Sequence, residues 1–233
     1  MVEVVSAIAA GSKGGGWSQG VTGFATFEVA NEPLAAGTAA LLARCITDPA
    51  LHARLMNTLS LLEHMGSHKI MATQHRGDID QPTLKHLADE TRHAYFFKRQ
   101  AEKTADRPLQ YKSADLLMPA SARMYFQRLE ACIVRSLPRP AHKLAVYLYM
   151  SMIVEFRAIW AYGLYQDALI RLAHPLSLRS LLAEESGHLA EMEARLDEIG
   201  AFDRGRVGAF CAIERRLYEK LLQGFERAVE NSA

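Results

Sequence analysis

The chain has 233 residues, of which 49% are hydrophobic, and its formal net charge is +1. This length and composition are sufficient to bury a substantial core within a single domain. The near-zero net charge gives no electrostatic reason to expect a nucleic acid or a membrane surface as a partner.

The N-terminal segment is rich in glycine, and we interpret residues 1–33 as a flexible arm ahead of a helical domain over residues 34–233. The first ten residues lack a basic leader and include Glu3, which is atypical of a signal peptide. Cys45, Cys132 and Cys211 are scattered and form no Cys-x-x-Cys pair, as expected of thiols in a reducing compartment. We therefore expect a cytoplasmic protein. No apolar run reaches the roughly 18 residues that a membrane-spanning helix requires.

Helical periodicity dominates the remainder of the chain, and no strand-turn-strand pattern is present. A short helix is expected near residues 34–46, after which Asp48 and Pro49 supply an N-cap and a proline suited to the first helical position. The pattern then predicts helices over about 49–75, 82–103, 120–136, 141 onward, 177–199 and 203–229. The sequence therefore predicts an all-α fold.

Four of these expected helices carry a repeated pattern of glutamate and histidine. Glu63 precedes Glu90-Thr91-Arg92-His93 by 27 residues (90 − 63), and Glu155 precedes Glu185-Ser186-Gly187-His188 by 30 residues (185 − 155). Positions three apart share one face of a helix, so each Glu-x-x-His can hold one ion. Two helices that give one glutamate each and two that give Glu-x-x-His form the ligand set of a dinuclear metal centre in a four-helix bundle.

The two lone glutamates carry most of the weight of this interpretation. Glu155 ends an uncharged run over residues 144–154, and Glu63 follows Leu59, Leu61 and Leu62. A carboxylate on such a helix is costly unless it is paired or bound to a metal. The alternative interpretation is two surface Glu/His pairs and two salt-bridged glutamates.

Residues beside the pattern are suited to support the ligands. Asp89 and Glu184 directly precede the two motif glutamates, and a carboxylate that accepts the free imidazole N–H would fix the tautomer of a ligating histidine. Arg92 could neutralise such a carboxylate.

Other histidines are left out of the expected ligand set. His86 shares a helix face with Glu90, four residues later, but a histidine near a helix start is more often exposed. His64, His68 and His75 have spacings that mostly point away from Glu63.

The helix that carries Glu155 presents a geometric conflict. With a turn at His174-Pro175, Glu155 lies 19 residues before the turn (174 − 155) and Glu185 lies 10 after it (185 − 175). The two carboxylates would then be about 13 Å out of level at 1.5 Å per residue. We therefore predict that this helix breaks early, between Gly163 and Asp167.

The segment Asp89-Glu90-Thr91-Arg92-His93 matches the Asp-Glu-x-Arg-His motif of ferritin-like di-iron carboxylate proteins, and residues 184–188 are a looser second copy. The chain resembles this superfamily over roughly residues 50–199. The resemblance implies a ferritin-like four-helix bundle with additional flanking helices and two bound iron ions, manganese being the alternative metal. It further implies that Glu63, Glu90 and His93 serve one ion and Glu155, Glu185 and His188 the other, with Glu90 and Glu185 bridging.

Departures from the family patterns separate its members. The ribonucleotide reductase small subunit has a radical tyrosine four residues past the first motif histidine, where this chain has Phe97. Rubrerythrins carry a further glutamate three residues after the third ligand, where this chain has Ala158, and a cysteine-rich iron module. Storage ferritins do not carry the full six-residue set. The remaining members are oxygen-activating oxidases and oxygenases, such as aldehyde-deformylating oxygenases, quinone hydroxylases and the tRNA-modifying hydroxylase.

The resemblance thus implies a di-iron enzyme that uses O₂ to oxidise or oxygenate a small, mostly apolar organic substrate. Carboxylate-rich sites suit iron or manganese. We expect an apolar substrate cavity at the centre, with room left by Gly66 and Ala94. Five aromatic residues are either candidate walls of this cavity or ordinary core residues: Tyr147, Tyr149, Phe156, Trp160 and Tyr162. An external electron donor and a homodimer are compatible with this function.

Two other classes of function stay open. The first is a protective protein that handles iron or peroxide, as a ferroxidase or a manganese catalase does, with the same ligands. The second is a non-enzymatic helical binding module whose glutamates only pair with arginines.

Overall fold

The computed structural model describes residues 21, 23–73, 79–138 and 143–231. Within these residues the protein is all-helical, with 85% helix and no strand, which confirms the predicted all-α class. The α-helices are α2 (Phe24–Thr47), α3 (Pro49–Thr73), α4 (Gln81–Ala105), α5 (Pro119–Ser136), α6 (Lys143–Arg171), α7 (Arg179–Glu198) and α8 (Arg204–Glu230), and a short 3₁₀ helix, η2, covers Ser113–Asp115.

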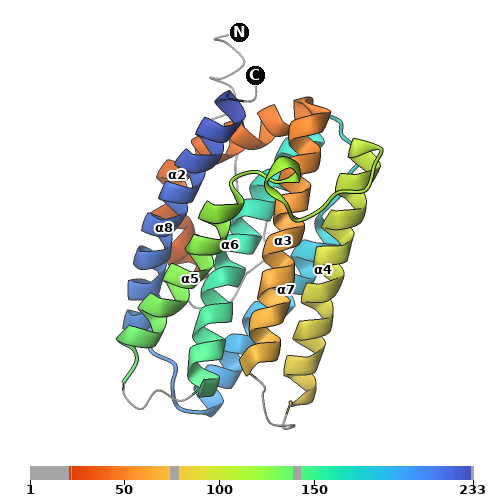
Figure 1. Cartoon of the computed structure of the whole chain (residues 1–233). Helices are drawn as coiled ribbons and strands as arrows, with labels where there is room; N and C mark the ends of the chain where they lie inside the picture. Colours follow the sequence, from red (N-terminus) through yellow and green to blue (C-terminus); the bar gives the residue numbers. More distant parts are fainter. Residues whose placement is uncertain (1–20, 22, 74–78, 139–142, 232–233) are drawn as a thin grey trace.

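The helices form a bundle around α6, which supplies many of the buried apolar side chains. Helix α3 packs along α4, and α6 packs along α7 (Figure 1). Helices α2, α5 and α8 pack against α6, and α8 also packs against both α2 and α5. The four helices α3, α4, α6 and α7 are those that carry the repeated glutamate and histidine pattern.

Helix α2 begins at Phe24, so the expected boundary between arm and domain at residue 33 is wrong for residues 24–33. The rings of Phe24 and Phe27 are buried, and they pack against Phe156 of α6 with centroid separations of 5.6 and 5.5 Å. This apolar contact extends the helix, and Pro33 lies inside it. Residues 1–20 and 22 of the expected arm lie outside the described part of the chain.

The corner between α2 and α3 has the predicted chemistry. The chain direction bends by 120° between the two helices. The Asp48 side chain accepts hydrogen bonds from the backbone N–H groups of Ala50 and Leu51 at 2.9 and 3.1 Å. Pro49 is the first residue of α3. The N-cap and first-position proline are therefore confirmed.

The predicted break of the third metal-carrying helix is wrong, because α6 continues to Arg171 without interruption. It ends in a Schellman-type turn, in which the N–H of His174 donates to the carbonyl of Leu169 at 2.9 Å and Ala173 has a φ of 50°. The chain then folds back along α6, and the N–H of Leu178 donates to Oε1 of Gln166 at 2.6 Å.

Because the chain folds back along α6, Glu155 and Glu185 come to similar heights in the bundle although α6 does not break. Because Leu178 lies beside Gln166, Glu155 is 11 residues from that level (166 − 155) and Glu185 is 7 residues from it (185 − 178). At 1.5 Å per residue the remaining offset is about 6 Å, which is within reach of two glutamate side chains.

The other helix bounds agree with the sequence prediction to within two residues wherever the structure describes them. The expected end of the first metal-carrying helix at His75 and the expected start of the third at Ala141 lie outside the described residues.

A buried ion pair ties α6 to α8. The guanidinium of Arg157 donates two hydrogen bonds of 2.8 Å to the carboxylate of Glu214, whose side chain is fully buried. Tyr125 of α5 donates to the same carboxylate at 2.7 Å, and Asn31 of α2 accepts from Arg157. Removal of either charge would leave the other buried and uncompensated.

The expectation that no apolar segment is long enough to span a membrane is wrong for α6, which is long and apolar enough by length and composition. Of its apolar window, 67% is buried inside the fold, a property shared by core helices of water-soluble proteins. Helices α2 and α3 satisfy the same measure if the bent pair is treated as one span.

Candidate metal centre

The six predicted ligands come together in the interior of the bundle. Helix α3 contributes Glu63, α4 contributes Glu90 and His93, α6 contributes Glu155, and α7 contributes Glu185 and His188. Each of these residues is at most 8% exposed. Four buried carboxylates that face one another are unfavourable as free anions, so the arrangement requires protons, cationic partners or metal ions.

Two groups of four residues have geometry suited to holding an ion. In each group the ligand atoms, one from each residue, all lie within 4.8 Å of one another. The first group is Glu63, Glu90, His93 and Glu185, and the second is His86, Glu90, Glu155 and His188. Glu90 belongs to both groups, as a bridging carboxylate would.

Glu185 also lies between the two groups. Its Oε1 is 3.1 Å from Nδ1 of His93, and its Oε2 is 3.1 Å from Nδ1 of His188. The resemblance assigned Glu185 to the ion of Glu155 and His188, whereas the interatomic distances group it with Glu63 and His93. Both positions are compatible with a carboxylate that spans the centre.

His86 was left out of the sequence-based ligand set as an exposed helix-start residue, and this expectation is wrong. Helix α4 begins at Gln81, and His86 lies one turn inside it at 5% exposure. Its Nε2 lies 3.1 Å from Oε1 of Glu155 and 3.4 Å from Oε1 of Glu90. The four-residue spacing from Glu90 was the available signal, and burial by α6 could not be read from it.

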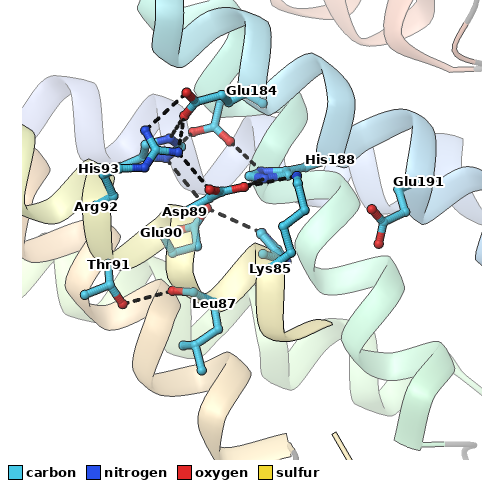
Figure 2. Close-up of polar contacts among 12 residues, drawn as sticks. Lys85, Leu87, Asp89, Glu90, Thr91, Arg92, His93, Glu184, His188 and Glu191 are labelled. Carbon is cyan, nitrogen blue, oxygen red and sulfur yellow. Dashed lines mark hydrogen bonds and ion pairs between the residues drawn. The ribbon is translucent and has the colours of Figure 1, made fainter. Parts of the chain in front are cut away.

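The acid that precedes each motif glutamate contacts the histidine of the other Glu-x-x-His motif. Glu184 contacts Nε2 of His93 at 2.8 Å, and Asp89 contacts Nε2 of His188 at 3.0 Å, so each acid supports the histidine of the other motif. Arg92 joins the two acids, with 2.7 Å hydrogen bonds to both (Figure 2). These contacts orient both rings with Nδ1 toward the centre.

Tyr162, which the sequence predicted only as a candidate wall of a substrate cavity, contacts a candidate ligand directly. The hydroxyl of Tyr162 donates a hydrogen bond to Oε1 of Glu63, and its ring lies 5.4 Å from that of Phe97. Tyr162 thus places a phenol beside a candidate ligand, with Phe97 next to its ring. Tyr162 lies seven residues after Glu155 on the same face of α6, and that spacing was the available signal.

The candidate walls divide into two sets. Tyr147 and Tyr162 lie at the centre, where Tyr147 bonds His86 and Tyr162 bonds Glu63. The other three pack elsewhere: Tyr149 donates to the carbonyl of Ala201, Phe156 packs against Phe24 of α2, and Trp160 packs against Tyr218. His64 and His68 pack against each other with ring centroids 4.5 Å apart, and His75 lies outside the described residues.

The space beside Gly66 is used by a ligand rather than left for a substrate. A Cβ at this position would lie 2.9 Å from Oε2 of Glu90, so the glycine admits the carboxylate. Ala94 is buried, and its carbonyl accepts a hydrogen bond from Ser60. A cavity of about 200 Å³ has none of the candidate ligands in its lining, which is formed by Gly23, Thr26, Arg204, Val207, Gly208 and Cys211.

Several side chains of the centre have pKa values that favour their protonated forms. Burial, followed by the charges of neighbouring carboxylates, holds the pKa values of Glu63 and Glu155 well above the usual range. Burial opposes the charged form of His93, but Glu185, Glu63 and Glu90 together raise its pKa to about 10. Burial likewise opposes ionisation of Glu185, yet the neighbouring imidazoles of His188 and His93 hold its pKa below the usual range.

One buried atom lacks the partner that a metal ion would provide. Nδ1 of His93 is buried and has no hydrogen-bond partner, although it faces Glu63, Glu90 and Glu185. The opposite nitrogen is already bonded to Glu184. A ring nitrogen that points toward carboxylate oxygens from a fixed ring is the arrangement of an imidazole ligand. The donor set therefore fits one or two divalent cations.

Comparison with protein-family models, with curated proteins and with solved structures finds no match for this chain. The observations that bear on its function are therefore the buried carboxylates and imidazoles of the centre.

Proposed function

We propose that this protein is a ferritin-like dinuclear metal enzyme that uses O₂ to oxidise or oxygenate a small, mostly apolar organic substrate. The observation that carries the proposal is the convergence of four buried glutamates with buried histidines in two four-residue groups that share Glu90. Two iron ions are the proposed cofactors, and manganese suits the same donors. Expected partners are O₂, the substrate and an external electron donor in the cytoplasm.

The donor types support the choice of metal. Carboxylate oxygen and imidazole nitrogen without thiolate favour iron or manganese over the softer ions that cysteine selects. When bound, a pair of such ions supplies Lewis acidity and the electrons for reduction of O₂.

The protein contributes orientation and the exclusion of water. Asp89 and Glu184 fix the rings of His188 and His93 through their outer nitrogens. The hydroxyl of Tyr162 holds a proton at Oε1 of Glu63, and both side chains are buried. Charged groups interact strongly in such an environment because little water screens them.

A protective role in iron or peroxide handling is the second candidate. It is favoured by the close packing of the centre, because the space beside Gly66 is filled by Glu90 and the phenol of Tyr162 lies against Glu63. O₂, peroxide and ferrous iron need less room than an organic substrate.

The binding-module alternative predicted that the glutamates pair with arginines. In the described residues, the recorded ion pairs of Glu90, Glu155 and Glu185 are with histidines. Arg92 pairs instead with the outer acids Asp89 and Glu184. This distribution favours the metal-binding alternatives.

The test is to load the protein anaerobically with ferrous iron and to mix it separately with O₂ and with hydrogen peroxide. Rapid O₂ consumption that is lost in Glu155→Ala and retained in His52→Asn is the expected result, since His52 lies outside the ligand set. Fast catalytic consumption of peroxide with slow reaction of O₂ would favour the protective role. Failure of the loaded protein to react with either would contradict both.

A further inference from the structure

His86 lies outside the doubled Glu-x-x-His pattern, yet its environment is that of a ligand. Its Nε2 lies near Oε1 of both Glu155 and Glu90, at 3.1 and 3.4 Å, and its ring centroid is 4.5 Å from that of His188. The side chain is 5% exposed. His86 therefore directs one nitrogen into the same small volume as two glutamates and a second histidine.

The other ring nitrogen is held from outside the centre. Nδ1 of His86 lies 2.8 Å from the hydroxyl of Tyr147, which is 4% exposed. The Thr83 side chain interacts with that hydroxyl, and Arg195 donates a hydrogen bond to Thr83 at 3.1 Å. This chain of contacts fixes the ring. When His86 carries its proton on Nδ1, this N–H donates a hydrogen bond to the Tyr147 oxygen, and the lone pair of Nε2 faces the centre.

The same construction supports the two motif histidines. Each of them has its outer nitrogen bonded to a fixed partner and its inner nitrogen directed at the carboxylates, with Glu184 behind His93 and Asp89 behind His188. His86 differs in having a neutral phenol behind it rather than an acid. A hydrogen-bond partner on the outer ring nitrogen is a regular property of ligating histidines.

We propose that His86 is a seventh protein ligand, bound through Nε2 to the ion held by Glu90, Glu155 and His188, and that Tyr147 is its positioning residue. This inference rests on the proposed dinuclear centre. It makes the two ions inequivalent, because one group has two imidazoles and two carboxylates and the other has one imidazole and three carboxylates.

The inequivalence has a chemical consequence. Imidazole suits zinc and iron, whereas carboxylate oxygen suits manganese. The His86 group should therefore prefer Zn²⁺ over Mn²⁺ more strongly than the carboxylate-rich group does. Loss of His86 should lower the affinity for one of the two bound ions, and the affinity for Zn²⁺ should fall more than the affinity for Mn²⁺.

The experiment compares His86→Ala with His52→Ala in titrations of the full-length protein with Mn²⁺ and with Zn²⁺. His52 is a matched control because it is also a buried histidine, 1% exposed, that bonds a tyrosine hydroxyl, that of Tyr165, outside the ligand set. Wild type and His52→Ala should bind two equivalents. In His86→Ala one equivalent should weaken by more than about 100-fold, since loss of an outer partner alone typically costs about 10- to 100-fold. Added imidazole should restore part of the loss.

Different failures have different meanings. Absence of Mn²⁺ and Zn²⁺ binding by the wild type would overturn the proposed centre itself. Two equivalents of unchanged affinity in His86→Ala would overturn the ligand assignment and leave the six-ligand centre standing.

A second variant covers a folding defect in His86→Ala. Tyr147→Phe keeps the ring packing and removes the hydroxyl, so it should weaken one equivalent by about 10- to 100-fold, while Tyr165→Phe should leave both unchanged. Equal affinities in Tyr147→Phe and Tyr165→Phe would overturn the positioning role.

Discussion

Substitution of Gly66 by alanine separates metal binding from fold stability. A Cβ at position 66 would lie 2.9 Å from Oε2 of Glu90, whereas ordinary contacts begin at 3.4 Å, so the carboxylate must shift by about 0.5 Å (3.4 − 2.9). That displacement is about equal to the 0.5 Å tolerance of a preorganised site. In the metal-free protein the flexible end of Glu90 can move, and replacement of a helical glycine should raise the free energy of unfolding by about 1 kcal/mol.

The expected result is therefore a variant that is as stable as the wild type or more stable without metal, yet binds metal about 10- to 100-fold more weakly. Gly187→Ala is the control, because Gly187 lies between Glu185 and His188 on α7 and a Cβ there meets nothing within 4 Å. It should gain the same helix stability with unchanged metal affinity. Denaturant unfolding of the metal-free proteins and equilibrium titration with Mn²⁺ measure the two quantities. Equal metal affinities in Gly66→Ala and Gly187→Ala would refute the close approach of Glu90.

Further predictions concern pH, the outer acids and the core. In the fold without bound metal, the pKa of His93 is raised to about 10. Protonated His93 therefore contributes about 5 kcal/mol to the free energy of unfolding below pH 6.5, and this contribution is lost as the pH rises through 10. Thermal melts between pH 6.5 and 10 should show a falling melting temperature, and a flat profile would contradict this prediction. Asp89→Asn should lower the metal affinity about 10- to 100-fold. Lys85→Gln removes an exposed partner of the same carboxylate and should leave the metal affinity nearly unchanged. Similar losses of affinity in both variants would indicate a general charge effect. Glu214→Gln should lower the free energy of unfolding by about 3–5 kcal/mol, because it leaves the buried charge of Arg157 uncompensated, without altering metal stoichiometry; a change in stoichiometry would show that the two clusters are coupled.

The sequence predicted the features that depend on local chemistry. Asp48 and Pro49 mark the start of α3 through capping alone, and the i, i+3 spacing of each Glu-x-x-His places both side chains on one helix face. The close approach of the six residues followed from that spacing and from short connections between paired helices.

Features that depend on contacts between distant helices were not predicted. The end of α6 uses Ala173 in the left-handed region, a position where glycine is the usual signal. The return of the chain depends on Gln166 and Leu178, which are 12 residues apart. His86 is buried against Tyr147 of α6 and His188 of α7, and the pattern of a single helix does not carry that information.

Anomalous diffraction from crystals grown with ferrous iron under anaerobic conditions tests the central claim most directly. The account predicts two iron peaks enclosed by α3, α4, α6 and α7, with Glu90 in contact with both. Crystals that show no iron in this volume, with the glutamates paired only to histidine and tyrosine side chains, would contradict it.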